Sequence, residues 1–286
     1  MSRPRLLTTL PELRDWRGAR TGPVHFVPTM GNLHAGHLRL VDTARAGAGA
    51  TIASIFVNPA QFGPGEDYER YPRTLDEDMD KLAGHGCDAV WAPDVATMYP
   101  RGADAFRIRV PDGLGDVLCG AHRAGHFDGV ATVVARLFWQ IRPDRAFFGE
   151  KDWQQWTILR AMVEDLSVAV AMESVPTERE ADGLAMSSRN RYLDEDQRRL
   201  APRLHETLAE IASRAAKEPE PGTFPALARS GMERLAERGF EPEYVEFRDA
   251  DTLGAPTGRN DRIFAAARLG TARLIDNVAV KRQSAD

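Results

Sequence analysis

The sequence predicts an α/β protein in which a parallel-sheet domain precedes a smaller C-terminal α+β domain. From Val24 to about Val175, short runs rich in β-branched and aromatic residues alternate with longer runs whose apolar residues recur every three or four positions. This alternation is typical of parallel strands joined by crossover helices. After Pro176, charged amphipathic segments lead into three strand-like runs joined by short loops, which favours a small antiparallel sheet.

The predicted parallel strands are mostly apolar throughout, as strands covered on both faces tend to be. They are the runs at 24–28, 51–57, 87–93, 145–149 and 168–175. The apolar spacing between them predicts helices with one buried face. These helices are expected at 38–46, 74–86, 128–142 and 152–166. This order indicates a Rossmann-like domain over residues 1–176.

A smaller C-terminal domain is predicted over residues 177–286, and we expect it to act as a lid. Two charged amphipathic helices are expected first, at 194–218 and 224–239. Strands are expected at 242–250, 261–269 and 271–278. We therefore expect a short antiparallel sheet covered by two helices.

Length, charge and cysteine content exclude several classes of protein. A chain of 286 residues with 43% hydrophobic content can form one large or two ordinary domains. The formal net charge of -5 and the pI of about 5.9 leave no basic excess for a nucleic-acid backbone. No segment approaches the roughly 18 apolar residues of a membrane helix, so we expect a cytoplasmic protein without nucleic-acid or membrane partners. Cys87 and Cys119 form no CxxC pair, which favours core packing over redox or zinc chemistry.

The stretch VPTMGNLHAGHLRLVDTARA places His34 and His37 where an apolar strand turns into an amphipathic helix. Ligands of open parallel sheets bind beyond the carboxyl ends of the strands, and a helix N-terminus favours an anion such as phosphate. Gly31 and Gly36 allow a ligand to approach the backbone closely. Two imidazoles at this point can donate hydrogen bonds to a reacting phosphate. A bare HxxH can also be a surface pair or half of a metal site, but no further ligand with suitable spacing accompanies it, so no metal site made by the protein alone is predicted.

Two later stretches carry residue types that bind phosphate. In FFGEKDWQQWTIL, Lys151 follows a predicted strand and can reach a phosphate, although a solvated Lys151 and a helix-capping Asp152 fit equally well. In GLAMSSRNRYL, the hydroxyls of Ser187 and Ser188 precede Arg189, and this cluster can cap a helix or fold over a triphosphate.

Six motifs together resemble the pantoate:beta-alanine ligase family, the pantothenate synthetases, which belong to the HxGH nucleotidyltransferases. The motifs are PTMGNLHAGH, VNPAQF, YPRT, GHFDGVATVV, FFGEKDWQQ and ADGLAMSSRNRYL, and they cover essentially the whole chain in family order. The chain departs from the usual pattern at Ala60 and Ala124, where the family often has threonine and proline. The resemblance implies ATP-dependent ligation of pantoate to beta-alanine through a pantoyl adenylate, with Mg²⁺ held mainly by the ATP phosphates, in a homodimer.

The resemblance also implies roles for individual residues. The catalytic and phosphate-binding residues would be His34, His37, Lys151, Ser187, Ser188 and Arg189. Further contacts to ATP would come from Met30, Gly36, Gly149, Asp152 and Glu178. Pantoate would be held by Gln61 and Gln155 with Met30 in the same pocket, and further substrate-side candidates are Asn58, Arg123 and His126. His126 can equally be a structural histidine.

The residue types fit this chemistry better than they fit the alternatives. The carboxylate of pantoate is ionised at neutral pH and can attack the α-phosphate without a general base. Another HxGH nucleotidyltransferase, which would keep the nucleotide on its product, is disfavoured by the tandem amides Gln154 and Gln155. An aminoacyl-tRNA synthetase-like protein is disfavoured by the negative net charge. A module that only senses ATP would not need the substrate amides.

Overall fold

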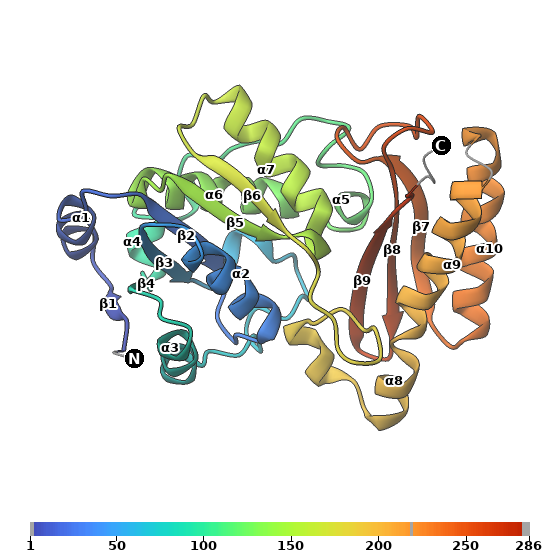
Figure 1. The fold of residues 1–286 in the computed structure, drawn as a ribbon, viewed down its shortest axis with the longest axis horizontal. Coiled ribbons are helices and arrows are strands. Elements are labelled where there is room, and N and C mark those ends of the chain that lie inside the picture. The colour runs from blue at the N-terminus through green and yellow to red at the C-terminus, as the bar shows by residue number, and fades with distance from the viewer. Residues whose placement is uncertain (1–2, 218–219, 282–286) are drawn as a thin grey trace. The chain divides into compact units, whose positions relative to one another are not determined.

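The computed structural model describes residues 3–217 and 220–281, and Figure 1 shows their helices and strands. The chain forms two compact units. The first comprises Met1–Pro111, Arg123–Glu150 and Ile158–Pro176, and the second comprises Asp112–His122, Lys151–Thr157 and Thr177–Asp286. The domain bounds 1–176 and 177–286 stay a prediction. Among the residues described, no helix has the length and apolar character needed to cross a membrane.

The first unit is built on a six-stranded sheet. Its strands are β1 (Arg5–Leu7), β2 (Val24–Thr29), β3 (Ala50–Ile55), β4 (Ala89–Trp91), β5 (Arg145–Gly149) and β6 (Ala171–Val175). Their order is β1-β4-β3-β2-β5-β6, and the paired strands run parallel, which confirms the predicted fold class. The central strand β2 pairs with β3 on one side and with β5 on the other. The strand order reverses between β2 and β5, at the position where open parallel sheets bind their ligands.

Helices cover both faces of this sheet. They include α1 (Leu10–Gly18), α2 (Ala35–Arg45), α3 (Leu75–Gly84), α4 (Val95–Met98) and α6 (His126–Ile141), and α7 (Trp153–Asp165) runs from the second unit into the first. Val27 of β2 lies in a buried cluster with Val41 of α2 and Met79 of α3. Its neighbour Phe26 points to the opposite face and meets Phe138 of α6 edge to face, with ring centroids 6.2 Å apart. The coverage of both faces explains why the strands are apolar throughout.

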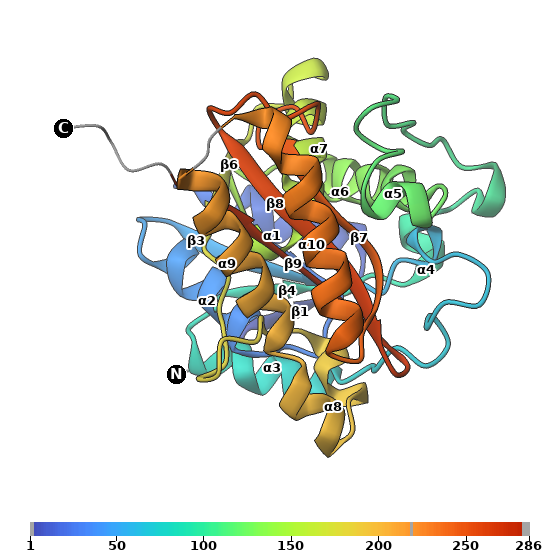
Figure 2. The same cartoon turned by 90° about the vertical axis from the view of Figure 1, so that its right-hand side faces the viewer.

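The second unit contains the predicted antiparallel sheet. Its strands are β7 (Glu241–Asp249), β8 (Asp261–Leu269) and β9 (Ala272–Ala279), in the order β7-β8-β9. Figure 2 shows α9 (Arg203–Lys217) and α10 (Phe224–Glu237) side by side in front of these strands. Ile211, Phe224 and Ala265 belong to the core that the helices and the sheet share.

The prediction of one continuous helix over 194–218 is wrong, and residue 218 lies outside the described residues. The segment forms α8 (Glu195–Leu200) and then α9, with a turn at Ala201 and Pro202 between them. Proline lacks the N–H that a helix interior requires, but it is tolerated in a first helical turn. Pro202 therefore ends one helix and precedes the next.

Candidate active site

The loop after β2 brings His34 and His37 together at the first turn of α2. His34 is the N-cap residue, and its Nδ1 accepts a hydrogen bond from the N–H of Gly36 at 3.2 Å. The Nδ1 of His37 accepts one from the N–H of His34 at 3.4 Å, and the two ring centroids are 4.0 Å apart. Because an accepting ring nitrogen carries no proton, the proton of either imidazole in its neutral form would lie on Nε2. The Nε2 atoms are thus the N–H groups of this pair, at a helix end that already favours anions.

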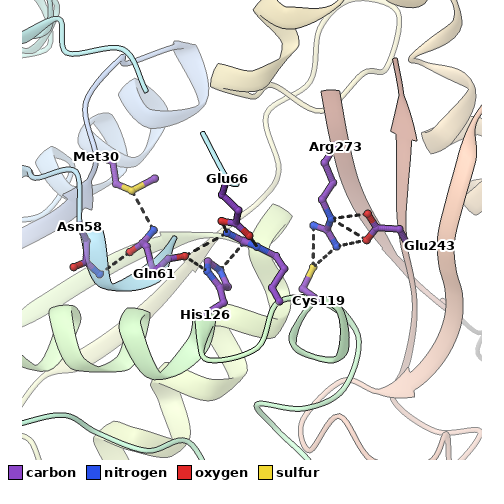
Figure 3. A network of polar contacts seen from close by, with 9 residues as sticks. Met30, Asn58, Gln61, Glu66, Cys119, His126, Glu243 and Arg273 are labelled. Carbon is purple, nitrogen blue, oxygen red and sulfur yellow. Dashed lines mark hydrogen bonds and ion pairs between the residues drawn. The ribbon is translucent and has the colours of Figure 1, made fainter. Parts of the chain in front are cut away.

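Asn58 fixes the orientation of the Gln61 amide (Figure 3). Gln61 ends the short helix η1 (Pro59–Gln61), and its Oε1 accepts a hydrogen bond from Asn58 Nδ2 at 3.0 Å. The Nε2 of Gln61 consequently points the other way, toward Met30 Sδ at 3.1 Å. Asn58 is 1% exposed, and its Oδ1 accepts a bond of 2.7 Å from the hydroxyl of Tyr99. The donor and acceptor atoms of Asn58 are thus engaged inside the first unit, where they orient Gln61.

Arg123 and His126 hold the backbone carbonyl of Gln61. Figure 3 shows His126 beside Gln61. A guanidinium can only donate, so the 2.8 Å contact between Arg123 Nη1 and His126 Nε2 makes Nε2 the acceptor. His126 then donates from Nδ1 to the carbonyl of Gln61 at 2.7 Å. Arg123 also binds Glu66 through bonds of 2.8 and 2.6 Å. Burial opposes ionisation of Glu66, but Arg123 outweighs it and lowers the pKa of Glu66. The substrate-side roles of Arg123 and His126 stay predictions, and the observed geometry gives both a structural role.

The second unit brings Lys151 and Ser187 to one pocket, which His205 and Asp276 also line. The Nδ2 of Asn277 donates to the carbonyl of Lys151 at 2.9 Å and so fixes the backbone there. The oxygen of Ser187 accepts a bond from the N–H of Arg189 at 3.2 Å. Ser187 thereby caps η4 (Ser188–Tyr192), so the capping that the sequence allowed is observed.

A buried carboxylate anchors the segment that leads to Ser187. Arg179 donates to both oxygens of Asp276, at 2.7 and 3.0 Å, and His205 Nδ1 lies 3.3 Å from the same carboxylate. Burial opposes ionisation of Asp276, but the nearby His205 ring and the bonds from Arg179 outweigh it, and the pKa of Asp276 is lowered. The backbone carbonyl of Glu178, the neighbour of Arg179, accepts a hydrogen bond of 3.0 Å from the N–H of Met186, the residue before Ser187.

The tandem amides have different environments. Gln154 is buried, its Oε1 accepts from the N–H of Cys119 at 3.0 Å, and its Nε2 donates to the carbonyls of Leu114 and Val117. Its amide therefore holds a neighbouring loop of the second unit. Gln155 is half-buried, and its predicted contact with pantoate stays a prediction.

Both cysteines are buried and free. Burial raises the pKa of the Cys87 thiol to about 11. Figure 3 also shows Cys119, whose sulfur lies 3.4 Å from Arg273 Nη2, while Arg273 pairs with Glu243 at 2.8 Å.

The predicted site residues are divided between the two units. The first unit carries Met30, His34, Gly36, His37, Asn58, Gln61, Arg123, His126 and Gly149. The second unit carries Lys151, Asp152, Gln155, Glu178, Ser187, Ser188 and Arg189. The structure brings together His34 with His37, Met30 with Gln61, and Lys151 with Ser187. The ligand assigned to each residue stays a prediction.

A parallel sheet with this strand order, and paired imidazoles at the start of the helix that follows its central strand, are typical of α/β proteins that bind phosphate-bearing ligands at this point. The chain belongs to the pantoate-beta-alanine ligase family, whose model matches residues 5–279. The predicted family and enzyme class, a ligase, are thereby confirmed.

Close relatives cover nearly the whole chain. The pantothenate synthetase of Chromohalobacter salexigens is 50% identical over 262 residues, which is 90% of each protein. That of Acidiphilium cryptum is 50% identical over 281 residues and covers 96% of this chain and 99% of the relative.

Two solved structures have the same fold. The pantothenate synthetase of Thermus thermophilus has a TM-score of 0.88 at 46% identity, over 96% of this chain and 99% of that one. The pantoate-beta-alanine ligase of Francisella tularensis, solved with beta-gamma ATP and beta-alanine, has a TM-score of 0.82 at 29% identity, over 97% and 98%.

Proposed function

We propose that this protein ligates pantoate to beta-alanine with ATP, through an enzyme-bound pantoyl adenylate, and releases AMP and pyrophosphate. The family match over residues 5–279 carries the proposal. The solved Francisella relative, which binds beta-gamma ATP and beta-alanine, supports the identity of two substrates.

In the first step, a carboxylate oxygen of pantoate forms a bond to the α-phosphorus of ATP. The bond from that phosphorus to the bridging oxygen of the β-phosphate breaks, and pyrophosphate leaves. Negative charge builds on the phosphate oxygens, and preorganised N–H donors stabilise such charge. The Nε2–H groups of His34 and His37 are donors of this kind, because their Nδ1 atoms accept backbone N–H bonds.

In the second step, the amine of beta-alanine attacks the acyl carbon, AMP leaves and the nitrogen loses a proton. The adenylate is a reactive mixed anhydride, so the protein must keep water away from it until the amine arrives. Gln61 is proposed to hold pantoate for both steps, since Asn58 binds its Oε1 and so directs its Nε2 donor toward Met30, which is proposed to lie in the same pocket.

The second unit is proposed to contribute further phosphate contacts from Lys151, Ser187, Ser188 and Arg189. Mg²⁺ is proposed to enter with ATP and to be held mainly by its phosphates. Among residues 3–217 and 220–281, no group of three or more His, Cys, Asp and Glu side chains is arranged to hold a metal ion.

A homodimer is proposed from the family resemblance, and a cytoplasmic location from the sequence. Sedimentation at micromolar concentration should give twice the chain mass of 31.6 kDa. A species with the mass of a single chain at micromolar concentration would contradict the dimer.

The ligase assay tests the function directly. Protein, Mg-ATP, pantoate and beta-alanine should together yield AMP and pantothenate. Omission of pantoate or beta-alanine should abolish pantothenate, whereas a nucleotidyltransferase of another kind would leave the nucleotide on its product. AMP formation that does not depend on pantoate would overturn the proposal.

A further inference from the structure

One buried carboxylate holds the loop that leads from β2 to His34. Asp78 of α3 is 0% exposed. Its Oδ2 accepts from the N–H of Asn32 and its Oδ1 from the N–H of Leu33, both at 2.8 Å. The hydroxyl of Thr74 donates to Oδ2 at 3.0 Å. Both oxygens are therefore used, and the two backbone donors belong to the residues directly before His34.

Lys81 holds the same loop from one helical turn further along α3. Its Nζ donates to the carbonyl of Leu33 at 2.9 Å. Residues three apart lie on one face of a helix, so Asp78 and Lys81 act on the loop from the same side. Leu33 is thus held at both its N–H and its carbonyl.

The backbone conformation of this loop needs such support. Gly31 and Asn32 have φ values of 81° and 51°, in the left-handed region that favours glycine. A Cβ at Gly31 would lie 3.0 Å from Asp78 Oδ2, so the carboxylate fits closely against the loop. His34 follows as an N-cap in extended conformation, and its ring direction depends on where the loop ends.

A simpler explanation is that Asp78 only adds negative charge near the N-terminus of α3, where acidic side chains are favourable. Asp76 already supplies that charge, and its side chain is 94% exposed. Burial of an ionised carboxylate is costly unless hydrogen bonds compensate for it. The complete burial of Asp78 and its bonds to the loop indicate a role that a surface charge does not explain.

We propose that Asp78, assisted by Lys81, is a positioning residue that sets the placement of His34 and His37 against the reacting phosphate. This inference rests on the proposed function of the two histidines. Asp78 acts through the loop backbone, and a misplacement of about 1 Å at a catalytic group can cost about 10²-fold in rate.

Asp78→Asn tests the proposal with little change in shape. The new amide keeps one acceptor oxygen, but its NH₂ group replaces the other oxygen and faces a loop N–H. Two donors cannot bond to each other, so one of the two bonds to the loop is lost. Asp76→Asn is the matched control, since it removes the same charge from the exposed side of the same helical turn. Both variants are compared at a temperature at which circular dichroism shows them folded.

The measurement is single-turnover adenylation with Mg-ATP and pantoate, followed by addition of beta-alanine to the loaded enzyme. Asp78→Asn should slow adenylation by about 10- to 100-fold and amine attack much less, and Asp76→Asn should change neither. In the double variant with His34→Ala, the combined loss should be smaller than the product of the two single losses, because part of the effect of Asp78 acts through the His34 imidazole. Multiplicative losses, or adenylation within about twofold of the wild-type rate, would overturn the proposal.

A second variant covers the case in which Asp78→Asn does not fold. Lys81→Met keeps the apolar stem and removes only the bond to Leu33, and Lys217→Met on α9 is its control. Lys81→Met should slow adenylation selectively, and an unchanged rate would overturn the proposal. If His34→Ala itself leaves adenylation unchanged, the proposed function of the histidines fails. If His34→Ala slows adenylation and the α3 variants do not, only the present inference fails.

Discussion

Replacement of Arg179 by methionine should destabilise the second unit strongly. The Asp276 side chain is 2% exposed, and Arg179 supplies two of its hydrogen bonds, at 2.7 and 3.0 Å. Without Arg179, the carboxylate keeps the N–H of Asn277 at 2.8 Å and His205 Nδ1 at 3.3 Å. Removal of one partner from a buried ion pair costs about 3–5 kcal/mol, and we expect about 3 kcal/mol here because these two contacts remain.

Arg198→Met is the matched control. Arg198 pairs with Asp182 at 2.5 Å, but the two side chains are 35% and 43% exposed. Such a pair contributes about 0–1 kcal/mol. Urea denaturation at pH 7, followed by circular dichroism, gives the free energy of unfolding of both variants. A loss for Arg179→Met no larger than that for Arg198→Met would refute the reasoning.

The same ion pair predicts a pH dependence. The pKa of Asp276 is lowered in the folded protein from its usual value of 3.8, so the folded state favours the ionised carboxylate. The resulting stability is present above pH 3.8 and is lost as the pH falls through the lowered pKa. The difference in unfolding free energy between wild type and Arg179→Met should therefore shrink as the pH is taken well below 4. A constant difference would contradict the assignment.

Three further predictions concern the site and the core. His34→Ala or His37→Ala should slow adenylation by about 10²- to 10³-fold and should slow amine attack on preformed adenylate much less. Equal losses in single-turnover assays of the two steps would contradict stabilisation of the reacting phosphate by the histidines. Gln61→Ala or Gln155→Ala should raise the KM for pantoate in steady-state assays, since each loses about 1 to 3 kcal/mol of binding free energy. A variant that weakened only the binding of ATP would oppose the assignment. Burial raises the pKa of the Cys87 thiol to about 11. The native protein should therefore not react at Cys87 with a disulfide reagent at pH 8. Labelling of Cys87 before unfolding, detected by mass spectrometry, would contradict this prediction.

Local periodicity is enough to predict the central strands and the helices α2, α3, α6 and α7 from the sequence, because each has an apolar run or stripe that faces the core. It could not reveal β1, which has only three residues at the sheet edge. The sequence does carry a signal for the start of α1. Thr9 and Glu12 have capping-box spacing, and the structure shows both of its hydrogen bonds.

The candidate site was predictable only where its chemistry is local. His34 and His37 are marked by a strand, a glycine turn and a helix in one short stretch. Asp78 lies two residues after exposed Asp76 in the same acidic run, and its partner Asn32 is 46 residues away. Arg179 and Asp276 are separated by 97 residues. No pattern in the sequence marks such pairs, because only the fold decides which charge becomes buried.

The sequence also could not distinguish the two tandem amides. Gln154 and Gln155 are chemically alike, but neighbouring residues of a helix point about 100° apart. The structure buries Gln154 against a loop and leaves Gln155 half-buried. The helix direction, which depends on tertiary packing, decides this difference.

The central claim is that pantoate is adenylated before beta-alanine reacts, and the pyrophosphate burst tests it most directly. Enzyme mixed with Mg-ATP and pantoate, without beta-alanine, should release about one pyrophosphate per active site and then stop, because the retained adenylate is shielded from water. Later addition of beta-alanine should convert the retained adenylate to pantothenate and AMP. If no pyrophosphate appears until beta-alanine is added, the adenylate pathway is contradicted.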